Sequence, residues 1–288
     1  MDSIKLKARA KINLGLDVIR KRDDGYHEVR MVMQTICIYD RITMTKNVDG
    51  NFNITANLPF LAVNENNLMY KAFMLVKNEF KFSGGIDVDL NKFIPIAAGL
   101  AGGSTDAAAV IFGLNKLFKL GMTVDEMMGL GVKIGADVPY CIMRGTALAE
   151  GIGEKLTRLK AMPDCYIVIA KPPVNVSTRL VYEKFDSIKD VSHPDIDGII
   201  QAINGEDINL VAARMGNVLE DVTVREYPVI DVIKKDMLSM GAVNAMMSGS
   251  GPTVFGIFKD KDMACRCKDC LREKADARQV YITEVFNQ

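Results

Sequence analysis

Hydrophobic and polar residues alternate with a period of two along most of the first sixty positions. The alternation runs through residues 4–19, 29–38, 40–45 and 52–56. Because successive side chains of a strand point to opposite faces, this pattern predicts strands. Clusters of aspartate, asparagine and glycine at 23–25 and 49–51 predict the turns between them.

Farther along the chain, apolar residues recur with the period of a helix, which predicts one helix on either side of a glycine-rich loop. The first runs from Asn66 to Phe80 and the second from Ser104 to Leu120. Thr123 and Glu126 form a capping box that begins a further helix.

Beyond residue 160 helices and strands alternate. The predicted helices there are 177–185, 194–203, 209–221 and 228–240, and the predicted strands are 166–170, 243–247, 253–258 and 279–285.

This change of pattern predicts two domains. Residues 1–160 are rich in strands and carry the glycine loop, whereas residues 161–288 are rich in helices. A chain of 288 residues is long enough for one large domain or two modest ones, and the change of pattern favours two.

The composition is that of a globular protein, with 49% hydrophobic and 25% charged residues. Thirty-six basic residues balance thirty-six acidic ones, so the net charge gives no basis for binding nucleic acid or an anionic membrane. No apolar run reaches the roughly 18 residues of a membrane span, and the N-terminus lacks the apolar core of a signal peptide. We expect a cytoplasmic protein.

The six cysteines are scattered, and we expect reduced thiols. The cluster of Cys265, Cys267 and Cys270 has two interpretations, a metal site or an ordinary helix. The helix is favoured, because Cys265 and Cys267 would point to different faces and no further motif completes a tetrahedral ligand set.

The strongest chemical signal is the glycine-rich loop, residues 95–106, which leads directly into an apolar helix. Glycines let successive N–H groups face one concavity, and the unpaired N–H groups of a helix start favour an anion. Ser104 and Thr105 stand in the first turn, where a hydroxyl can cap the helix or reach a phosphate-bound Mg²⁺. The loop matches neither a Walker loop nor the Rossmann fingerprint. A plain glycine turn with a serine cap is the alternative.

Three blocks together resemble the GHMP kinase superfamily, in the order that this superfamily uses. They are Lys11–Leu16, Pro95–Ala109 and Met247–Phe255. Residues 25–28, 135–139 and 149–154 further resemble the members that act on a cytidine diphosphate sugar-alcohol in the non-mevalonate isoprenoid pathway. The resemblance implies an α+β, two-domain fold, with an N-terminal domain like domain 2 of ribosomal protein S5 and a ferredoxin-like C-terminal domain. The active site is then expected between the domains.

The resemblance also implies that ATP with Mg²⁺ donates a phosphoryl group to a substrate hydroxyl. The catalytic positions correspond to Lys11 and Asp137. A carboxylate can take the hydroxyl proton, and a lysine can keep that carboxylate ionised and add positive charge at the reacting oxygens. From the residues alone, Lys11 would be a solvated strand residue and Asp137 a helix-end residue.

The other site residues follow from the resemblance. Those expected at ATP and its phosphates are Pro95, Gly99, Leu100, Ala101, Gly102, Gly103, Ser104 and Thr105, with Asn67 and Lys92 near the adenine. Those expected at the cytidine substrate are Asn13, Tyr26, His27 and Tyr182, with Tyr26 stacked on the cytosine and His27 bonded to its edge. Tyr182 is equally well interpreted as an ordinary residue of an amphipathic helix. No residue is assigned as a metal ligand, because Mg²⁺ arrives with ATP. We expect a monomer or weak homodimer, with no nucleic acid or membrane partner.

Two positions depart from the family pattern. Ala101 replaces a usual glycine, and Thr105-Asp106 replaces a common Ser-Asn. A carboxylate at Asp106 suits a helix start but is awkward near phosphate unless Mg²⁺ intervenes or the side chain points away. Two rival functions stay open: a GHMP kinase of another alcohol, such as homoserine or mevalonate, and a catalytically silent nucleotide-binding protein.

Overall fold

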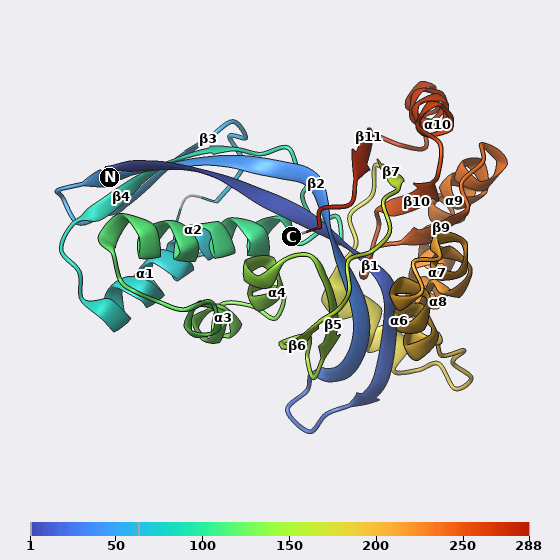
Figure 1. Cartoon of the computed structure of the whole chain (residues 1–288), viewed down its shortest axis with the longest axis horizontal. Coiled ribbons are helices and arrows are strands. Elements are labelled where there is room, and N and C mark those ends of the chain that lie inside the picture. Colours follow the sequence, from blue (N-terminus) through green and yellow to red (C-terminus); the bar gives the residue numbers. More distant parts are fainter. Residues whose placement is uncertain (1, 63, 288) are drawn as a thin grey trace. The chain divides into compact units, whose positions relative to one another are not determined.

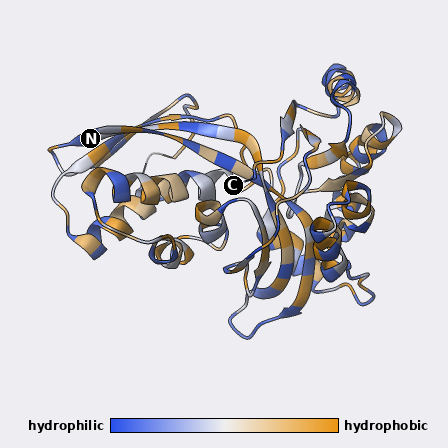
Figure 2. Ribbon diagram, viewed as in Figure 1, coloured by the Kyte–Doolittle hydropathy of each residue, from blue (hydrophilic) through white to orange (hydrophobic). Residues whose placement is uncertain are grey.

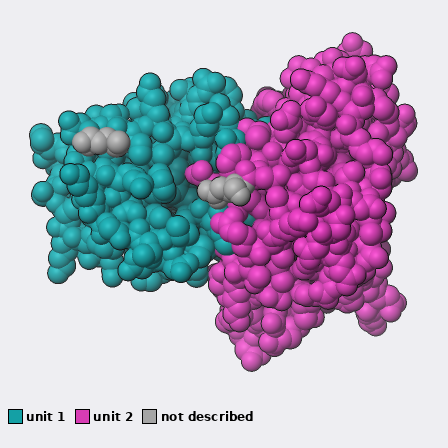
Figure 3. Space-filling view, viewed as in Figure 1, with its two compact units in different colours: residues 1–10, 38–96, 101–143 teal, residues 11–37, 97–100, 144–288 magenta. Residues whose placement is uncertain are grey.

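The computed structural model describes residues 2–62 and 64–287. They form two compact units, which Figure 3 colours separately and whose residues interleave along the chain. Unit 1 comprises residues 1–10, 38–96 and 101–143, and unit 2 comprises residues 11–37, 97–100 and 144–288. The predicted domains, 1–160 and 161–288, follow the order of the chain and stay a prediction.

Two long strands, β1 (Ser3–Lys21) and β2 (His27–Asn47), contribute to both units. In unit 1 they lie in one sheet with β3 (Phe52–Ala56) and β4 (Gly85–Asn91), in the order β3-β4-β2-β1. In unit 2 β2 pairs with β5 (Thr146–Glu150), β5 with β6 (Lys155–Arg158), and β1 with the short β8 (Gly216–Asn217). The two strands predicted at 29–38 and 40–45 are therefore one continuous strand.

Helices α1 (Leu68–Phe80), α2 (Gly102–Phe118), α3 (Val124–Val132) and α4 (Val138–Met143) complete unit 1 (Figure 1). Helix α2 is buried along most of its length and packs closely on the sheet. A Cβ at Gly113 would lie 2.4 Å from the sulfur of Met44 and 3.1 Å from a methyl of Leu6. The capping box of Thr123 and Glu126 is confirmed, whereas α4 was not predicted.

Unit 2 contains a second sheet, with the antiparallel order β11 (Gln279–Glu284), β7 (Tyr166–Lys171), β10 (Val254–Phe258), β9 (Asn244–Met247). Helices α9 (Val229–Ser239) and α10 (Lys261–Glu273) pack against it. β10 is buried throughout, in keeping with the hydrophobic residues of this sheet in Figure 2. The other helices are α5 (Thr178–Phe185), α6 (Ile196–Asn204), α7 (Ile208–Arg214) and α8 (Glu220–Glu226).

The single helix predicted over 209–221 is wrong, because strand β8 divides it into α7 and α8. Gly216 pairs with Gly15 and Asn217 with Leu16, which extends the sheet beyond β1. The Asn217 side chain also donates to the carbonyls of Met247 and Gly249, at 2.9 and 2.8 Å. These long-range bonds outweigh the local helical pattern.

Within residues 2–62 and 64–287, no helix is both long and apolar enough to cross a membrane. The same residues contain no group of three or more His, Cys, Asp or Glu side chains that could hold a metal ion. Cys265, Cys267 and Cys270 are free thiols on α10. Cys267 faces the interior, and burial raises the pKa of its thiol to about 12.

Candidate active site

Lys11 and Asn13 stand on the same face of β1, as the alternation predicts. The Nζ atom of Lys11 donates a hydrogen bond to Oδ1 of Asn13 at 2.8 Å, and Asn13 donates to the sulfur of Met31 at 3.3 Å. Lys11 is only 5% exposed and Asn13 is fully buried, so Lys11 is not a solvated strand residue. Because a buried ammonium must keep polar partners, this bond fixes the direction of both side chains.

The glycine loop is attached directly to this pair through the backbone. The N–H of Lys11 donates to the carbonyl of Leu100 at 3.2 Å, and the hydroxyl of Ser248 donates to the carbonyl of Gly99 at 3.0 Å. Gly99 has a φ of 71°, and a Cβ there would lie 2.1 Å from the carbonyl oxygen of Ser248. Residues 97–100 of the second block therefore meet the first and third blocks within unit 2, and Ser248 of the third block holds the loop at Gly99.

The loop continues into the start of α2, where the backbone offers donors to an anion. Ala101 occupies the N-cap with a φ of 57°, and among the described residues no side chain caps this helix. Gly103 is exposed and Gly102 and Ser104 are partly exposed, and the first N–H groups of a helix have no partner within it. These features fit a phosphate group. Thr105, by contrast, is buried at 2% exposure, so Ser104 is the better placed hydroxyl.

Beneath the start of α2, Lys92 lies between two buried aspartates of unit 1. Its Nζ donates to Oδ2 of Asp40 and, at 2.8 Å, to Oδ2 of Asp106. Asp40 also accepts the backbone N–H groups of Phe93 and Ile94, at 2.6 and 2.8 Å. Asp106 thus points into the core, away from the loop surface. The Lys92 ammonium is occupied by this triad, and its expected role near adenine stays a prediction.

The triad has two carboxylates for one ammonium. Burial alone would lower the pKa of Lys92, but the two carboxylates outweigh it and raise that pKa. Burial, reinforced by Asp40 and opposed by Lys92, raises the pKa of Asp106 well above its ordinary value of 3.8. Among the described residues, Oδ1 of Asp106 has no hydrogen-bond partner. Burial and the neighbouring Asp40 thus disfavour the ionised form of Asp106, compared with an exposed aspartate.

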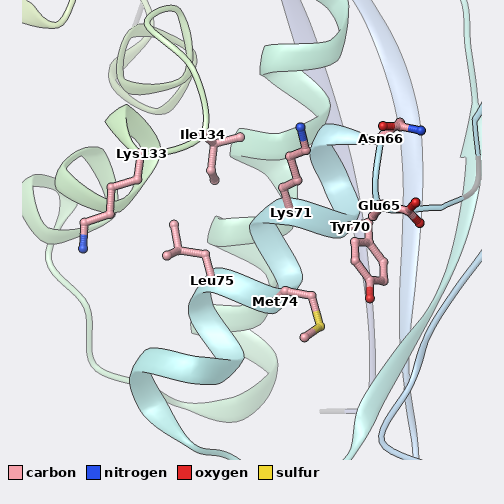
Figure 4. A pocket seen from close by; sticks show the side chains of 8 residues that line it. All are labelled: Glu65, Asn66, Tyr70, Lys71, Met74, Leu75, Lys133 and Ile134. Carbon is pink, nitrogen blue, oxygen red and sulfur yellow. The ribbon is translucent and has the colours of Figure 1, made fainter.

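Asn67 caps the start of α1. Its side chain accepts from the N–H of Met69 at 2.9 Å and donates to the carbonyl of Ala62 at 2.7 Å. A pocket of about 580 Å³ lies beside this end of the helix, lined by Glu65, Asn66, Tyr70, Lys71, Met74, Leu75, Lys133 and Ile134. Figure 4 shows that α1 supplies one wall of this pocket, the segment just before α1 supplies Glu65 and Asn66, and the segment after α3 supplies Lys133 and Ile134. The adenine contact expected of Asn67 stays a prediction.

Asp137 directly precedes α4, and its carbonyl accepts the N–H of Cys141 at 3.0 Å. Pro139 stands in the first turn of this helix, where its missing N–H is not needed. Asp137 is partly exposed. It therefore sits at a helix start rather than at a helix end. Its expected pairing with Lys11 stays a prediction.

The expected base-binding residues lie in unit 2. His27 begins β2, and its ring lies 4.8 Å from the ring of Tyr182 on α5, with 34° between the planes. Tyr26 is 60% exposed and is held by its N–H, which donates to Asp24 at 3.1 Å. The structure thus brings His27 and Tyr182 together, whereas the base contact expected of Tyr26 stays a prediction.

Sequence reasoning missed the partners of these residues. Asp186 accepts from Nε2 of His27 at 2.7 Å, and Lys21 forms an ion pair with the same carboxylate at 2.6 Å. Asp40 and Asn217 were missed as well. For Asp40 the sequence holds a weak signal, a charged residue between the apolar positions Ile38 and Ile42 of a strand.

Comparison with known proteins identifies the family. The N-terminal domain of the GHMP kinases matches residues 67–145, and their C-terminal domain matches residues 199–277. A protein of Lachnospira eligens named 4-diphosphocytidyl-2-C-methyl-D-erythritol kinase is 67% identical over 99% of both chains. A protein of Lachnoclostridium phytofermentans with the same name is 51% identical over 99% of this chain and 98% of its own.

Solved structures agree. A crystal structure of 4-(cytidine 5'-diphospho)-2C-methyl-D-erythritol kinase has a TM-score of 0.85 at 29% identity, covering 99% of this chain and 100% of its own. The homoserine kinase of Cytophaga hutchinsonii has a TM-score of 0.80 at 21% identity, covering 100% and 96%, and shares the fold. The predicted superfamily and its two-domain α+β fold are thus confirmed. The chain belongs to the GHMP kinase family and groups with the members named 4-diphosphocytidyl-2-C-methyl-D-erythritol kinase.

Proposed function

We propose that this chain transfers the γ-phosphate of ATP to the 2-hydroxyl group of 4-diphosphocytidyl-2-C-methyl-D-erythritol. The observation that carries the proposal is the network that joins Lys11, the Gly99–Leu100 loop and Ser248, because it pairs a buried ammonium with an anion-binding loop. The names of relatives that cover almost the whole chain support this substrate.

The start of α2 binds the phosphates of ATP in this proposal. Its first N–H groups and dipole hold the transferring phosphoryl group, and Ser104 adds a hydroxyl. Mg²⁺ accompanies ATP and offsets the charge of the phosphates. Phosphoryl transfer needs mainly positioning and charge stabilisation, so a direct in-line transfer without a phosphoenzyme is sufficient.

Asp137 takes the proton of the attacking hydroxyl as the new bond forms. Such a base contributes on the order of 10²–10⁴-fold in rate. Lys11 stabilises the charge that develops on the reacting oxygens. Asn13, already bonded to Lys11, orients the substrate near the hydroxyl. At the other end of the substrate, Tyr26 and Tyr182 enclose the cytosine and His27 bonds its edge.

The test is ATP turnover by the purified protein with different alcohols. ADP release should depend on the cytidine diphosphate substrate and should be absent with homoserine or mevalonate. ADP release with either of those alcohols would assign another GHMP kinase activity. ATP binding without turnover on any alcohol would instead support a silent nucleotide-binding protein.

A further inference from the structure

The strongest feature outside the phosphate loop is the fixed imidazole of His27. Its Nε2 lies 2.7 Å from Oδ1 of Asp186, which caps the C-terminus of α5. The side chain of His27 is only 9% exposed, and Tyr182 lies against its ring. An imidazole that is held on one edge and covered on one face cannot turn freely.

The chemistry of this contact decides which nitrogen carries the proton. An ionised carboxylate only accepts hydrogen bonds, so Nε2 must be the N–H donor to Asp186. A neutral imidazole has one N–H, which leaves Nδ1 as an acceptor. The contact therefore selects one of the two tautomers.

Lys21 keeps the carboxylate ionised and balances its charge. Its Nζ lies 2.6 Å from Oδ2 of Asp186, the oxygen that His27 does not use. Burial acts to raise the pKa of Asp186, but the hydrogen bonds from Lys21 and His27 outweigh it and lower that pKa. The ammonium of Lys21 thus balances the charge of the Asp186 carboxylate on the side away from His27.

We infer that Asp186, backed by Lys21, orients His27 as a hydrogen-bond acceptor, so that the site selects a pyrimidine with a 4-amino group over one with a 4-keto group. A 4-amino group donates to Nδ1, whereas a 4-keto oxygen would face the Nδ1 lone pair without a proton between them. Asp186 is a positioning residue for base specificity. The inference rests on the proposed function only in taking the substrate base as cytosine.

The first test compares kcat/KM for the cytidine substrate and for its uridine diphosphate analogue. A site built to bond a polar group rejects the analogue lacking it, so the wild type should favour cytidine by about 100-fold or more. In Asp186→Asn the amide can donate to Nε2 and let Nδ1 carry the proton. The preference should then fall below about tenfold. The control is Asp190→Asn, an exposed aspartate beyond α5, which should keep the wild-type ratio.

The second test observes the tautomer without any turnover. Nitrogen-15 NMR of the whole protein should show His27 protonated at Nε2 in the wild type, and a mixed or reversed tautomer in Asp186→Asn. A wild-type His27 protonated at Nδ1, or an unchanged base preference in a folded Asp186→Asn, would overturn the inference. If the protein phosphorylates neither nucleotide substrate, the proposed function fails, while the NMR result still decides the tautomer.

Discussion

Lys11 and Asn13 are joined by a 2.8 Å hydrogen bond inside the protein, on the strand face that also anchors the glycine loop. A lysine residue that is only 5% exposed is rarely retained for stability alone. Its position beside the loop makes it the centre of the proposed chemistry.

Replacing Lys11 with methionine removes this charge while keeping an unbranched side chain of similar length. We expect kcat to fall on the order of 10²–10³-fold, the usual effect of losing one stabilising group for developing charge. Steady-state kinetics with the cytidine substrate measure the effect. Lys5→Met, an exposed position on the same strand, is the matched control and should leave kcat unchanged. A Lys11→Met enzyme that is folded and fully active would contradict the role.

Asp137→Asn tests the proposed base. The amide cannot accept the hydroxyl proton, so transfer should fall by about 10²–10⁴-fold. The affinity for ATP should change little, because the phosphates are held by the start of α2. Single-turnover kinetics give the rate, and calorimetric titration of ATP gives the affinity. Equal loss of rate and ATP affinity would point to a binding role rather than to a base.

Gly99→Ala tests the contact between the loop and Ser248. The new Cβ would meet a backbone carbonyl at 2.1 Å, in addition to the strain of a φ of 71°. Gly121 is a close control, since its φ is 73° and nothing lies within 4 Å of an added Cβ. Gly121→Ala should cost about 1–2 kcal/mol of unfolding free energy from strain alone. Gly99→Ala should cost more and weaken ATP binding. Urea denaturation measures both unfolding free energies. Equal losses in Gly99→Ala and Gly121→Ala would refute the close contact between Gly99 and Ser248.

Asp106→Asn tests the protonation of the buried triad. Folding raises the pKa of the Asp106 carboxyl above its ordinary value of 3.8. Below that pH the carboxyl is protonated in both the folded and the unfolded protein, so its titration does not change the free energy of unfolding. As the pH rises above 3.8, the Asp106 carboxyl ionises in the unfolded chain before it does so in the folded protein. The wild type therefore loses unfolding free energy until the pH passes the pKa of the folded state. Asparagine has no proton to lose. Asp106→Asn should therefore melt higher than the wild type at pH 7, by a few degrees, and the gap should shrink toward pH 4.

Asp40→Asn provides the contrast. Asp40 accepts from Lys92 and from two backbone N–H groups, so the loss of its charge leaves a buried ammonium with too little compensation. This variant should lose about 3 kcal/mol or more. Melting curves that shift alike with pH in both variants would mean that Asp106 is ionised in the folded protein.

Much of the fold was predictable because its signals are local. The period of β1, the apolar stripe of α2 and the capping box at Thr123 each depend on neighbouring residues. The helix expected over 209–221 failed because Gly216 and Asn217 pair with a strand some two hundred residues earlier. No local pattern carries that information.

The candidate site also has parts that local sequence patterns predict and parts that they do not. Glycines before an apolar helix predict an anion-binding loop, and alternation predicts that Lys11 and Asn13 share a face. The bond between His27 and Asp186 joins positions 159 residues apart, and Asp40 meets Asp106 only through the ammonium of Lys92. Such partners follow from the tertiary fold, which places complementary charges together only after the chain has collapsed.

The most direct measurement follows the phosphoryl group itself. Excess purified protein is mixed with ATP, Mg²⁺ and 4-diphosphocytidyl-2-C-methyl-D-erythritol, and phosphorus NMR is recorded on the quenched products. Our account predicts one ADP for each new phosphomonoester, with the phosphate on the oxygen of carbon 2. Release of inorganic phosphate instead, a phosphate on another hydroxyl, or unchanged ATP and alcohol would contradict it.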